Sequence, residues 1–413
     1  IYTLSLHDAL PIYYRSYLMT LRVWQSTPGR WLSTEPCIFR NGEWVTVDAD
    51  KFPGAVMQSM YAPNYIGKGT IWQRDVSNMP LAANSAVMAK WMHDNTPTPW
   101  GAGAWGAKTG INTSAYGTVP IATYLVDSSH PRCEYQYIDS CRGHGVTQDE
   151  INNYLVGKIP WPHFAKPAPM GDRGMAIYDV ATGIMREYFY VKPVDGSPRH
   201  WIAATGGFSV AKPGLVDLAT TNYGGQCQGG GSAVVCMHNS LGFIGIAEIR
   251  RGYIDHALAF TTANFAKGLP PSWPAQMSDG KAPEDQAPFS PRHGQWARLS
   301  ADVDPDYNPA TSQPYNPLTR LIIRAAKKYG LVATDTNAWC HAFNAECGYQ
   351  EEAMFGADPW KSGEMVSILS PDKNYRHRAL DVSDFPWDKT EWAEVDWVDN
   401  RSEERRVGKE CRS

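Results

Sequence analysis

The sequence predicts a mainly β protein, a β-sandwich or jelly roll of antiparallel sheets with a few short helices. Short runs of β-branched and aromatic residues, bounded by turn residues, recur along the chain. Aromatic residues make up 12% of the chain and charged residues only 19%. This is typical of a large β structure with aromatic-lined surfaces, and equally of a large core. Helical periodicity is rare, which favours strands as the framework.

The first half of the chain predicts two short helices and one hairpin. The segment 84–93 has helical periodicity behind a possible Asn cap. Thr147 and Glu150 form a capping-box pattern that predicts a second short helix. The runs 175–178 and 184–191 flank an Asp, Thr and Gly turn. We therefore expect them to pair as an antiparallel hairpin.

The second half predicts further strands and the longest helix. The strands are expected at 201–208, 254–262 and 331–334. The helix is expected at 316–329, because Asn316 can cap it, Pro317 suits its first turn and Gly330 can end it. Its apolar residues repeat at helical spacing and form one stripe.

The two ends of the chain do not look like natural protein sequence. Residues 1–12 and 401–413 contain what one sequencing-library adapter encodes when its two DNA strands are translated. The natural segment is then 13–400, which we expect to form a single β-rich domain, with a possible subdomain from about residue 316. We expect the export signal of the natural protein to lie in a missing part of the chain.

Charge and hydropathy exclude two classes of partner. The formal net charge of −4 argues against nucleic acid. No apolar run approaches the length of about 18 residues that a membrane span needs. The sequence therefore predicts no nucleic-acid partner and no membrane span.

The cysteines predict disulfide-closed loops. Once Cys411 in the C-terminal adapter end is set aside, six cysteines form close pairs along the chain: Cys133 with Cys141, Cys227 with Cys236, and Cys340 with Cys347. Cys37 is left over. Such pairs favour an oxidising, extracellular compartment. Unrelated thiols in a reducing cytosol remain the alternative, while the absence of any C-x-x-C disfavours zinc.

Four segments carry a resemblance to a group of secreted bacterial proteins from soil actinobacteria and myxobacteria. They are 72–85, 159–179, 241–260, and 273–280 leading into 317–332. The resemblance implies export and a mainly β domain, and it carries no reaction. Where these proteins often have a histidine two positions after an aspartate, this chain has Gly174 after Asp172. Three other histidines could replace it: His163, His200 and His256.

The candidate catalytic residues are acidic and imidazole side chains. Asp75 and Asp172 are the expected pair of carboxyl groups, and Glu248 is held in reserve. His256, with apolar neighbours, reads as a hydrogen-bonded core residue or as a general acid or base. Arg173 beside Asp172 reads as a structural ion pair or as a substrate clamp. Asp75 could equally cap the turn that follows it.

Metal and nucleophile motifs are poor. Asp302, Asp304 and Asp306 imitate the start of a calcium loop, but Pro305 interrupts it and position twelve is Gln313. The chain has no H-E-x-x-H, G-x-S-x-G or Walker motif. We therefore expect no metal, apart from this weak calcium possibility, and no cofactor.

Together these observations predict a secreted carbohydrate-active enzyme. Trp72, Trp105 and Trp273 are the candidate residues for stacking on sugars. Hydrolysis of a polysaccharide by paired carboxyl groups is the first hypothesis. A polysaccharide lyase with a His or Tyr base and Arg173 is an alternative, and so is a non-catalytic glycan-binding or cell-surface protein. All of these depend on an open groove lined by tryptophan.

Overall fold

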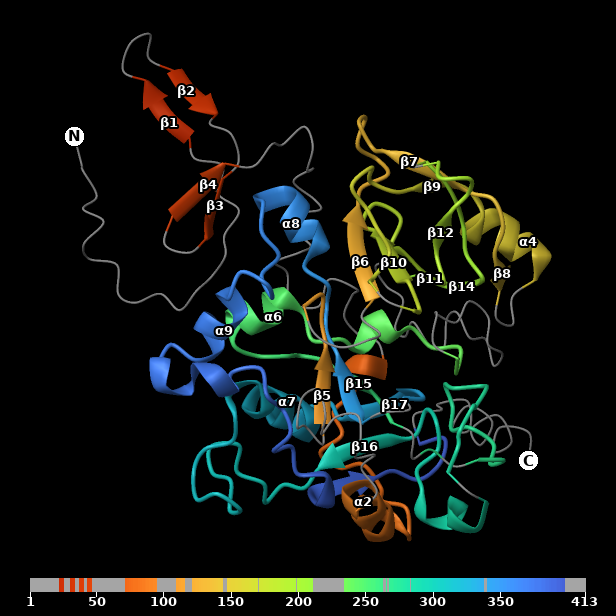
Figure 1. Cartoon of the computed structure of the whole chain (residues 1–413), viewed down its shortest axis with the longest axis vertical. Helices are drawn as coiled ribbons and strands as arrows, with labels where there is room; N and C mark the ends of the chain where they lie inside the picture. The colour runs from red at the N-terminus through yellow and green to blue at the C-terminus, as the bar shows by residue number, and fades with distance from the viewer. Residues whose placement is uncertain are drawn as a thin grey trace, which may run out of the picture.

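The computed structural model describes most of the chain between residues 71 and 397 and four short strands before it. The described ranges are 22–25, 30–33, 37–40, 43–46, 71–94, 109–115, 121–143, 147–169, 171–197, 199–210, 234–262, 265, 267–282, 284–337 and 340–397. Helix accounts for 25% and strand for 26%, and three mixed sheets form the framework (Figure 1). Strands are thus abundant, as expected, but helices are equally so.

The five-stranded sheet contains the hairpin that the sequence predicts. Its order is β6 (Ile121–Val126), β10 (Gly174–Asp179), β11 (Ile184–Phe189), β14 (Thr205–Val210) and β8 (Arg142–Gly143). β10 and β11 pair antiparallel, which confirms the hairpin. The Asp179 carboxylate closes its turn by accepting the Ala181 N–H at 3.2 Å and the Thr182 hydroxyl at 2.7 Å.

The four-stranded sheet has the order β12 (Lys192–Pro193), β13 (His200–Ile202), β7 (Tyr135–Ile138) and β9 (Gly157–Pro160). The single strand expected at 201–208 is wrong, because it divides between β13 in this sheet and β14 in the five-stranded one. Ala203 N–H bonds to the Ser140 carbonyl, and the next N–H, of Ala204, bonds to Phe189 at the end of β11. The chain therefore changes sheets within two residues.

The six-stranded sheet has the order β19 (Thr390–Trp392), β16 (Trp296–Leu299), β17 (Leu331–Asp335), β15 (Leu258–Thr261), β18 (His341–Asn344) and β5 (Thr109–Asn112). β17 confirms the strand expected at 331–334. β15 begins only at Leu258, so the first four residues of the strand expected at 254–262 do not belong to it. β5 and β17 to β19 share this sheet, so the chain after residue 316 forms no sheet of its own.

The expectation of purely antiparallel sheets is wrong, since all three sheets are mixed and none of them is closed. β6 runs parallel to β10, β7 to β13, β8 to β14, β15 to β17 and β5 to β18. Parallel neighbours need crossover connections through distant parts of the chain. Local alternation of apolar residues reveals a strand but not the direction of its neighbour. The sequence pattern therefore does not specify whether neighbouring strands are parallel or antiparallel.

The helices predicted from the sequence are present. α7 (Pro317–Lys328), α2 (Ser85–Asp94) and the capping box that starts α4 (Gln148–Glu150) confirm the three predictions. Asn316 does not cap α7 with its side chain. Asp384 fixes the start of the helix instead, because its carboxylate accepts the Asn316 N–H and the Thr319 hydroxyl, both at 2.6 Å.

The remaining helices were not expected. The α-helices are α6 (Ile246–Arg251), α8 (Tyr349–Phe355) and α9 (Glu364–Leu369). The short 3-10 and π segments are η1 (Ile71–Gln73), η2 (Ile151–Leu155), η3 (Asn239–Gly242), η4 (Glu284–Phe289), η5 (Lys373–Arg378) and η6 (Trp387–Lys389). The three α-helices span two turns or less, too little for the apolar repeat on which sequence reading depends.

Near the N-terminus, β1 (Arg22–Gln25) pairs with β2 (Arg30–Ser33), and β3 (Cys37–Arg40) with β4 (Glu43–Thr46). The adapter-like ends, 1–12 and 401–413, lie outside the described residues. Within the part that is described, no helix has both the length and the hydropathy to cross a membrane.

Three buried clusters join the sheets into layers. α7 and α2 cover one face of the six-stranded sheet through residues such as Ile322 and Met88. A second cluster joins the other face to the five-stranded sheet, through residues such as Val332 and Tyr178. A third joins the five- and four-stranded sheets around Trp161. The five-stranded sheet is therefore the middle layer and is covered on both faces, which is why β6 and β10 are buried along their whole length.

Two of the three expected disulfides are wrong. Cys133, Cys141, Cys340 and Cys347 are free thiols. The segment 341–346 between the last two is β18 followed by two bridge residues, so it extends about 20 Å, whereas a disulfide needs Cα atoms about 4.4–6.8 Å apart. β7 similarly separates Cys133 from Cys141. Cys236 is disulfide-bonded, while Cys227 lies outside the described residues, so that pairing stays a prediction.

Gly330 links α7 to β17 in a conformation that suits glycine. Its φ is +88°, and a Cβ there would stand 2.6 Å from the Ala297 carbonyl oxygen. We expect Gly330→Ala to lower the free energy of unfolding by about 1–3 kcal/mol from backbone strain alone, and by more because of the clash. Gly356 is the matched control, since its φ is +80° and a Cβ at that position would have no neighbouring atom within 4 Å. Urea denaturation that gives equal losses for the two alanine variants would contradict this account.

Candidate functional site

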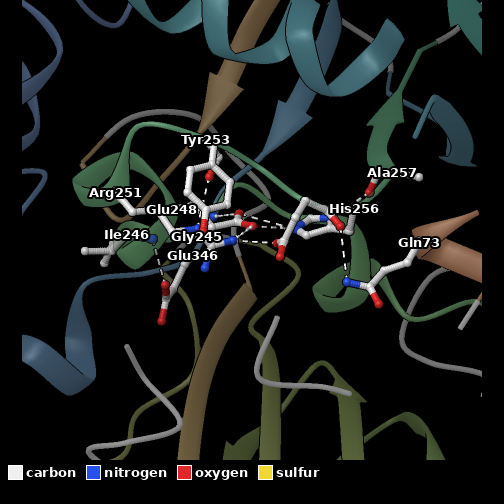
Figure 2. Close-up of polar contacts among 10 residues, drawn as sticks. Gln73, Gly245, Ile246, Glu248, Arg251, Tyr253, His256, Ala257 and Glu346 are labelled. Atoms are coloured by element: carbon white, nitrogen blue, oxygen red, sulfur yellow. Dashed lines mark hydrogen bonds and ion pairs between the residues drawn. The ribbon is translucent and has the colours of Figure 1, made fainter. Parts of the chain in front are cut away.

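Two of the four candidate catalytic residues, Glu248 and His256, are in contact. The His256 Nε2 atom lies 3.1 Å from Glu248 Oε1, and both side chains are buried (Figure 2). Glu248 lies in α6, where its Oε2 accepts the Gly245 N–H at 2.8 Å at the start of the helix. Arg251 bridges Glu248 and Asp255 from the last turn of α6. This cluster lies at the amino end of β15.

The surroundings of His256 favour the imidazolium form. Its Nδ1 donates to the Ala257 carbonyl at 2.7 Å, and its Nε2 donates to the Glu248 carboxylate. Burial has the largest single effect and lowers the pKa of His256, but the charge of Glu248 and the hydrogen bonds to Glu248 and Ala257 together outweigh it and leave the pKa raised. Burial likewise raises the pKa of Glu248, and His256 and Arg251 reverse that shift. Both ring nitrogens are occupied as donors, so this histidine has no free lone pair to act as a base.

A second buried ion network lies beside this cluster. Arg250 donates two parallel hydrogen bonds to Glu351, at 2.5 and 2.7 Å, and a third to Glu364 at 2.8 Å. The side chains of all three are at most 8% exposed. A guanidinium shared by two buried carboxylates connects α6, α8 and α9. The network fixes three short helices and presents no free group to a substrate.

Glu346 is a buried carboxyl group in the same region. Its Oε2 accepts the Ile246 N–H at 2.9 Å. Burial raises its pKa to about 8, and the charges of Glu351 and Glu248 act in the same direction. The group is therefore protonated at neutral pH and hydrogen-bonded at the beginning of α6.

Glu346 makes the stability of the fold depend on pH. Its folded-state pKa is raised from 4.5 to about 8, so only the unfolded chain loses this proton between those values, and stability falls as pH rises through that window. We expect the melting temperature of Glu346→Gln, relative to the natural chain, to rise from pH 4.5 to pH 8 and then to level off. A constant difference across this range would show that Glu346 is ionised in the folded protein.

Asp75 lies on the surface, in a salt bridge. Its Oδ2 is 2.6 Å from Lys328 Nζ, and its Oδ1 accepts the Ser77 N–H at 2.8 Å. The bond from Lys328, with that from Ser77, lowers the pKa of Asp75 to about 2. It therefore cannot hold a proton for transfer at neutral pH, and its carboxylate caps the turn that follows it.

Asp335 lies at the end of β17 opposite to Asp75, and its carboxyl group can hold a proton near neutral pH. It is half-buried, and burial raises its pKa to about 7. The charges of Asp279 and Asp172 raise this pKa further, while the Thr336 N–H and the Asn239 side chain donate hydrogen bonds to the carboxyl group and oppose the rise. β17 and β15 are parallel, with Thr261 opposite Asp335. Asp335 thus lies within electrostatic reach of Asp279 and Asp172, at the carboxyl end of β17, and ligands bind at such strand ends in many open sheets.

His293 positions the loop that carries Asp279. Its Nδ1 lies 2.9 Å from the Ser278 hydroxyl, and its Nε2 lies 3.7 Å from Asp279 Oδ1. Thr336, next to Asp335, donates its hydroxyl to the Asp279 carboxylate. Burial lowers the pKa of His293 to about 3, so the imidazole is neutral and adds no positive charge to the three carboxyl groups.

Asn239 supplies a polar atom that has no hydrogen-bond partner among the described residues. Its side-chain amide donates to Asp335, while its Oδ1 atom is buried and accepts no hydrogen bond from the part of the chain that the structure describes. Glu187 of β11 holds the segment in place by accepting the Asn239 N–H at 3.2 Å and the Ser240 N–H at 3.1 Å. A buried acceptor without a donor is costly unless a ligand or water satisfies it. It therefore marks the surroundings of Asp335 as a place where a hydroxyl group could bind.

The expected pair of Asp75 and Asp172 is not brought together. Asp75 binds Lys328 before β17, whereas Asp172 acts on Asp335 at the end of that strand. The four steps from Leu331 to Asp335 span about 13 Å. Asp172 is half-buried in the turn before β10, and burial raises its pKa. Its charge acts on Asp335, which the charge of Asp279 also influences, so the paired-acid idea moves to Asp335 and Asp279.

The tryptophans expected to stack on sugars are buried. Trp72 is 3% exposed and Trp273 is 5% exposed, both in the core between the six- and five-stranded sheets. Trp105 lies outside the described residues. The expectation that Trp72 and Trp273 line an open groove is therefore wrong, because a layered fold of this size uses its indoles to fill the space between sheets.

The calcium-like run is held by arginines. The Asp306 carboxylate pairs with Arg320 and Arg324 of α7, and its N–H bonds to Asp304. These guanidinium groups place positive charge at the oxygen atoms that calcium would need. No group of three or more potential metal ligands occurs within the described ranges.

Sequence reading missed Asp335, Asp279, His293 and Asn239. Asp279 and Asp335 lie inside or just after segments that carry the family resemblance, 273–280 and 317–332, which was the only available signal. Nothing local distinguishes them from surface residues, because their shared position depends on how β17, η3 and the 272–280 loop meet. The chain matches no protein-family model, no curated protein and no solved structure.

Proposed function

We propose that the chain is a hydrolase of glycosidic bonds in a polysaccharide, with Asp335 as the proton donor. The observation that carries the proposal is the position of Asp335, whose pKa burial raises to about 7, beside Thr336, which donates its N–H to Asp335 and its hydroxyl to Asp279. A glycosidase needs one carboxyl group that is protonated at working pH and a second that is ionised nearby. Asp335 meets the first requirement, and Asp279, which is 40% exposed, is the candidate for the second.

In this mechanism, the Asp335 proton moves to the glycosidic oxygen as the bond from that oxygen to the anomeric carbon breaks. A water molecule attacks the anomeric carbon and passes a proton to the Asp279 carboxylate. Exchange of protons with solvent restores both groups. Burial keeps Asp335 protonated, with a smaller contribution from the charges of Asp279 and Asp172, and Asn239 Oδ1 accepts a hydrogen bond from a sugar hydroxyl. The Thr336 hydroxyl, bonded to Asp279, orients that carboxylate.

A polysaccharide lyase is the second candidate, and one observation favours it. Arg173 is exposed and directly follows Asp172, so its guanidinium can neutralise the carboxylate of a uronic acid. His256 cannot supply the base for elimination, since both of its ring nitrogens donate hydrogen bonds. The exposed Tyr190 near Arg173 is the remaining candidate base.

The test is incubation of the chain with a panel of plant, algal and microbial polysaccharides. We expect new reducing ends without the ultraviolet absorbance of an unsaturated product. Asp75→Asn is the matched control, because it removes a carboxylate on the far side of β17. Absorbance would favour the lyase, and binding without cleavage would favour a glycan-binding protein. The extracellular location stays a prediction that now depends mainly on the resemblance.

A further inference from the structure

The outer face of the four-stranded sheet exposes tyrosines. Along β7 the burial alternates, with Gln136 and Ile138 buried and Tyr135 and Tyr137 exposed by 36% and 50%. Successive side chains of a strand point to opposite faces. The two tyrosines therefore project away from the core around Trp161, on the face of the sheet opposite to the five-stranded layer.

Cationic side chains flank these tyrosines on the neighbouring strands. Lys158 of β9 is paired with Tyr137 in the register, and its Nζ lies 4.7 Å from the Tyr135 ring centre. His200 of β13 is paired with Tyr137 on the other side, with ring centres 5.3 Å apart. Asp139 lies 3.8 Å from His200 Nε2 and offsets any charge on that imidazole. The positive charge of this part of the sheet therefore comes from Lys158.

The same pattern continues towards the acid site. Tyr190, 42% exposed, lies between β11 and β12, and Lys192 of β12 is 5.9 Å from its ring centre. The Arg173 guanidinium is also 5.9 Å from this ring. Backbone hydrogen bonds from Tyr190 to Asp172 and from Val191 to Arg173 fix the two segments side by side. Arg173 thus connects the exposed face to Asp172, whose charge acts on Asp335.

We propose that this tyrosine–lysine face, made of Tyr135, Tyr137, Lys158, Tyr190 and Lys192, binds an acidic polysaccharide and that Arg173 directs it to Asp335. Tyrosine rings offer flat apolar surfaces to the C–H faces of sugars, and the ammonium and guanidinium groups complement uronate carboxylates. Only one part of this inference rests on the proposed function, namely that Arg173 directs the polysaccharide towards Asp335. Binding to the face itself can be tested separately.

Binding is measured by calorimetry with a polygalacturonate oligomer and, for comparison, a neutral β-glucan oligomer of the same length. Asp335→Asn serves as the background, so that the ligand is not consumed. We expect Tyr137→Ala to weaken binding of the uronate oligomer about tenfold. Tyr307→Ala is the matched control, because Tyr307 is equally exposed at 50% and lies outside the face; it should leave affinity unchanged. Replacing Lys158 and Lys192 together by Gln should weaken binding and reduce its dependence on salt.

The outcomes separate this inference from the proposed function. Equal affinity for the neutral oligomer, or an unchanged affinity after Tyr137→Ala, would overturn the assignment of the face. If uronate binding is weakened by Tyr137→Ala and unchanged by Tyr307→Ala, the assignment of the face is supported, even if no polysaccharide is ever cleaved. Cleavage of a polysaccharide that is insensitive to all the face variants would support the hydrolase and overturn the face as its binding surface.

Discussion

The Asp335→Asn variant is expected to lose about 10²- to 10⁴-fold of its kcat for polysaccharide hydrolysis, the usual contribution of a general acid. Asparagine keeps the size of the side chain and can still accept the Thr336 N–H, which lies 2.8 Å from Asp335 Oδ1. It cannot donate a carboxyl proton to the leaving oxygen. Initial rates of reducing-end release, measured at saturating substrate, give the ratio directly.

The pH profile identifies the role of this residue. Because the pKa of Asp335 is raised to about 7, the protonated donor is present below that value and is lost above it. The rate of the natural chain should therefore fall as pH rises through 7, and the residual rate of Asp335→Asn should not. Asp75→Asn, with its carboxylate at the other end of β17, should keep both the rate and the profile. Full activity in Asp335→Asn would exclude Asp335 as the acid.

Replacing Arg250 by alanine should give the largest loss of stability. The substitution leaves the Glu351 and Glu364 carboxylates buried without their counter-ion, and breaking a buried pair in this way costs about 3–5 kcal/mol. We expect a corresponding fall in the midpoint of urea denaturation. The loss comes from the uncompensated charges, and less of it should remain at a pH that protonates both carboxyl groups.

Lys90→Ala is the control for a surface ion pair. Lys90 bonds to Asp94 one turn later on α2, with the two side chains 76% and 44% exposed. Such pairs contribute about 0.3–0.5 kcal/mol because water and salt screen them. If the two alanine variants unfold at the same urea concentration, the Arg250 network does not stabilise α6, α8 and α9 as described.

Local patterns predicted local structure well. α7 was predictable because its apolar stripe, first-turn proline and terminal glycine agree within one segment. The hairpin of β10 and β11 was predictable because its turn is encoded by Asp179 and Gly183. The run 254–262 was misread, because Ala257 bonds to the Trp72 carbonyl rather than to a strand partner. That partner is distant in the sequence, so no local rule could show it.

The candidate site was predictable only in part for the same reason. Asp172 was selected from the sequence, but its electrostatic effect on Asp335 was not suggested there. Trp72 and Trp273 were selected for their chemistry, but burial removed them. Burial and proximity decide whether a carboxyl group holds a proton, and both depend on contacts between separate sheets. Residue type alone specifies neither.

Glu187 makes the strength of the acid depend on the position of the middle layer. It belongs to β11, yet its carboxylate holds the backbone of Asn239 and Ser240, and Asn239 donates to Asp335. A small displacement of the five-stranded sheet would withdraw that donor, and Asp335 would then keep its proton more tightly. The proton affinity of Asp335 is therefore set jointly by its own strand and, through Asn239, by Glu187 of the neighbouring sheet.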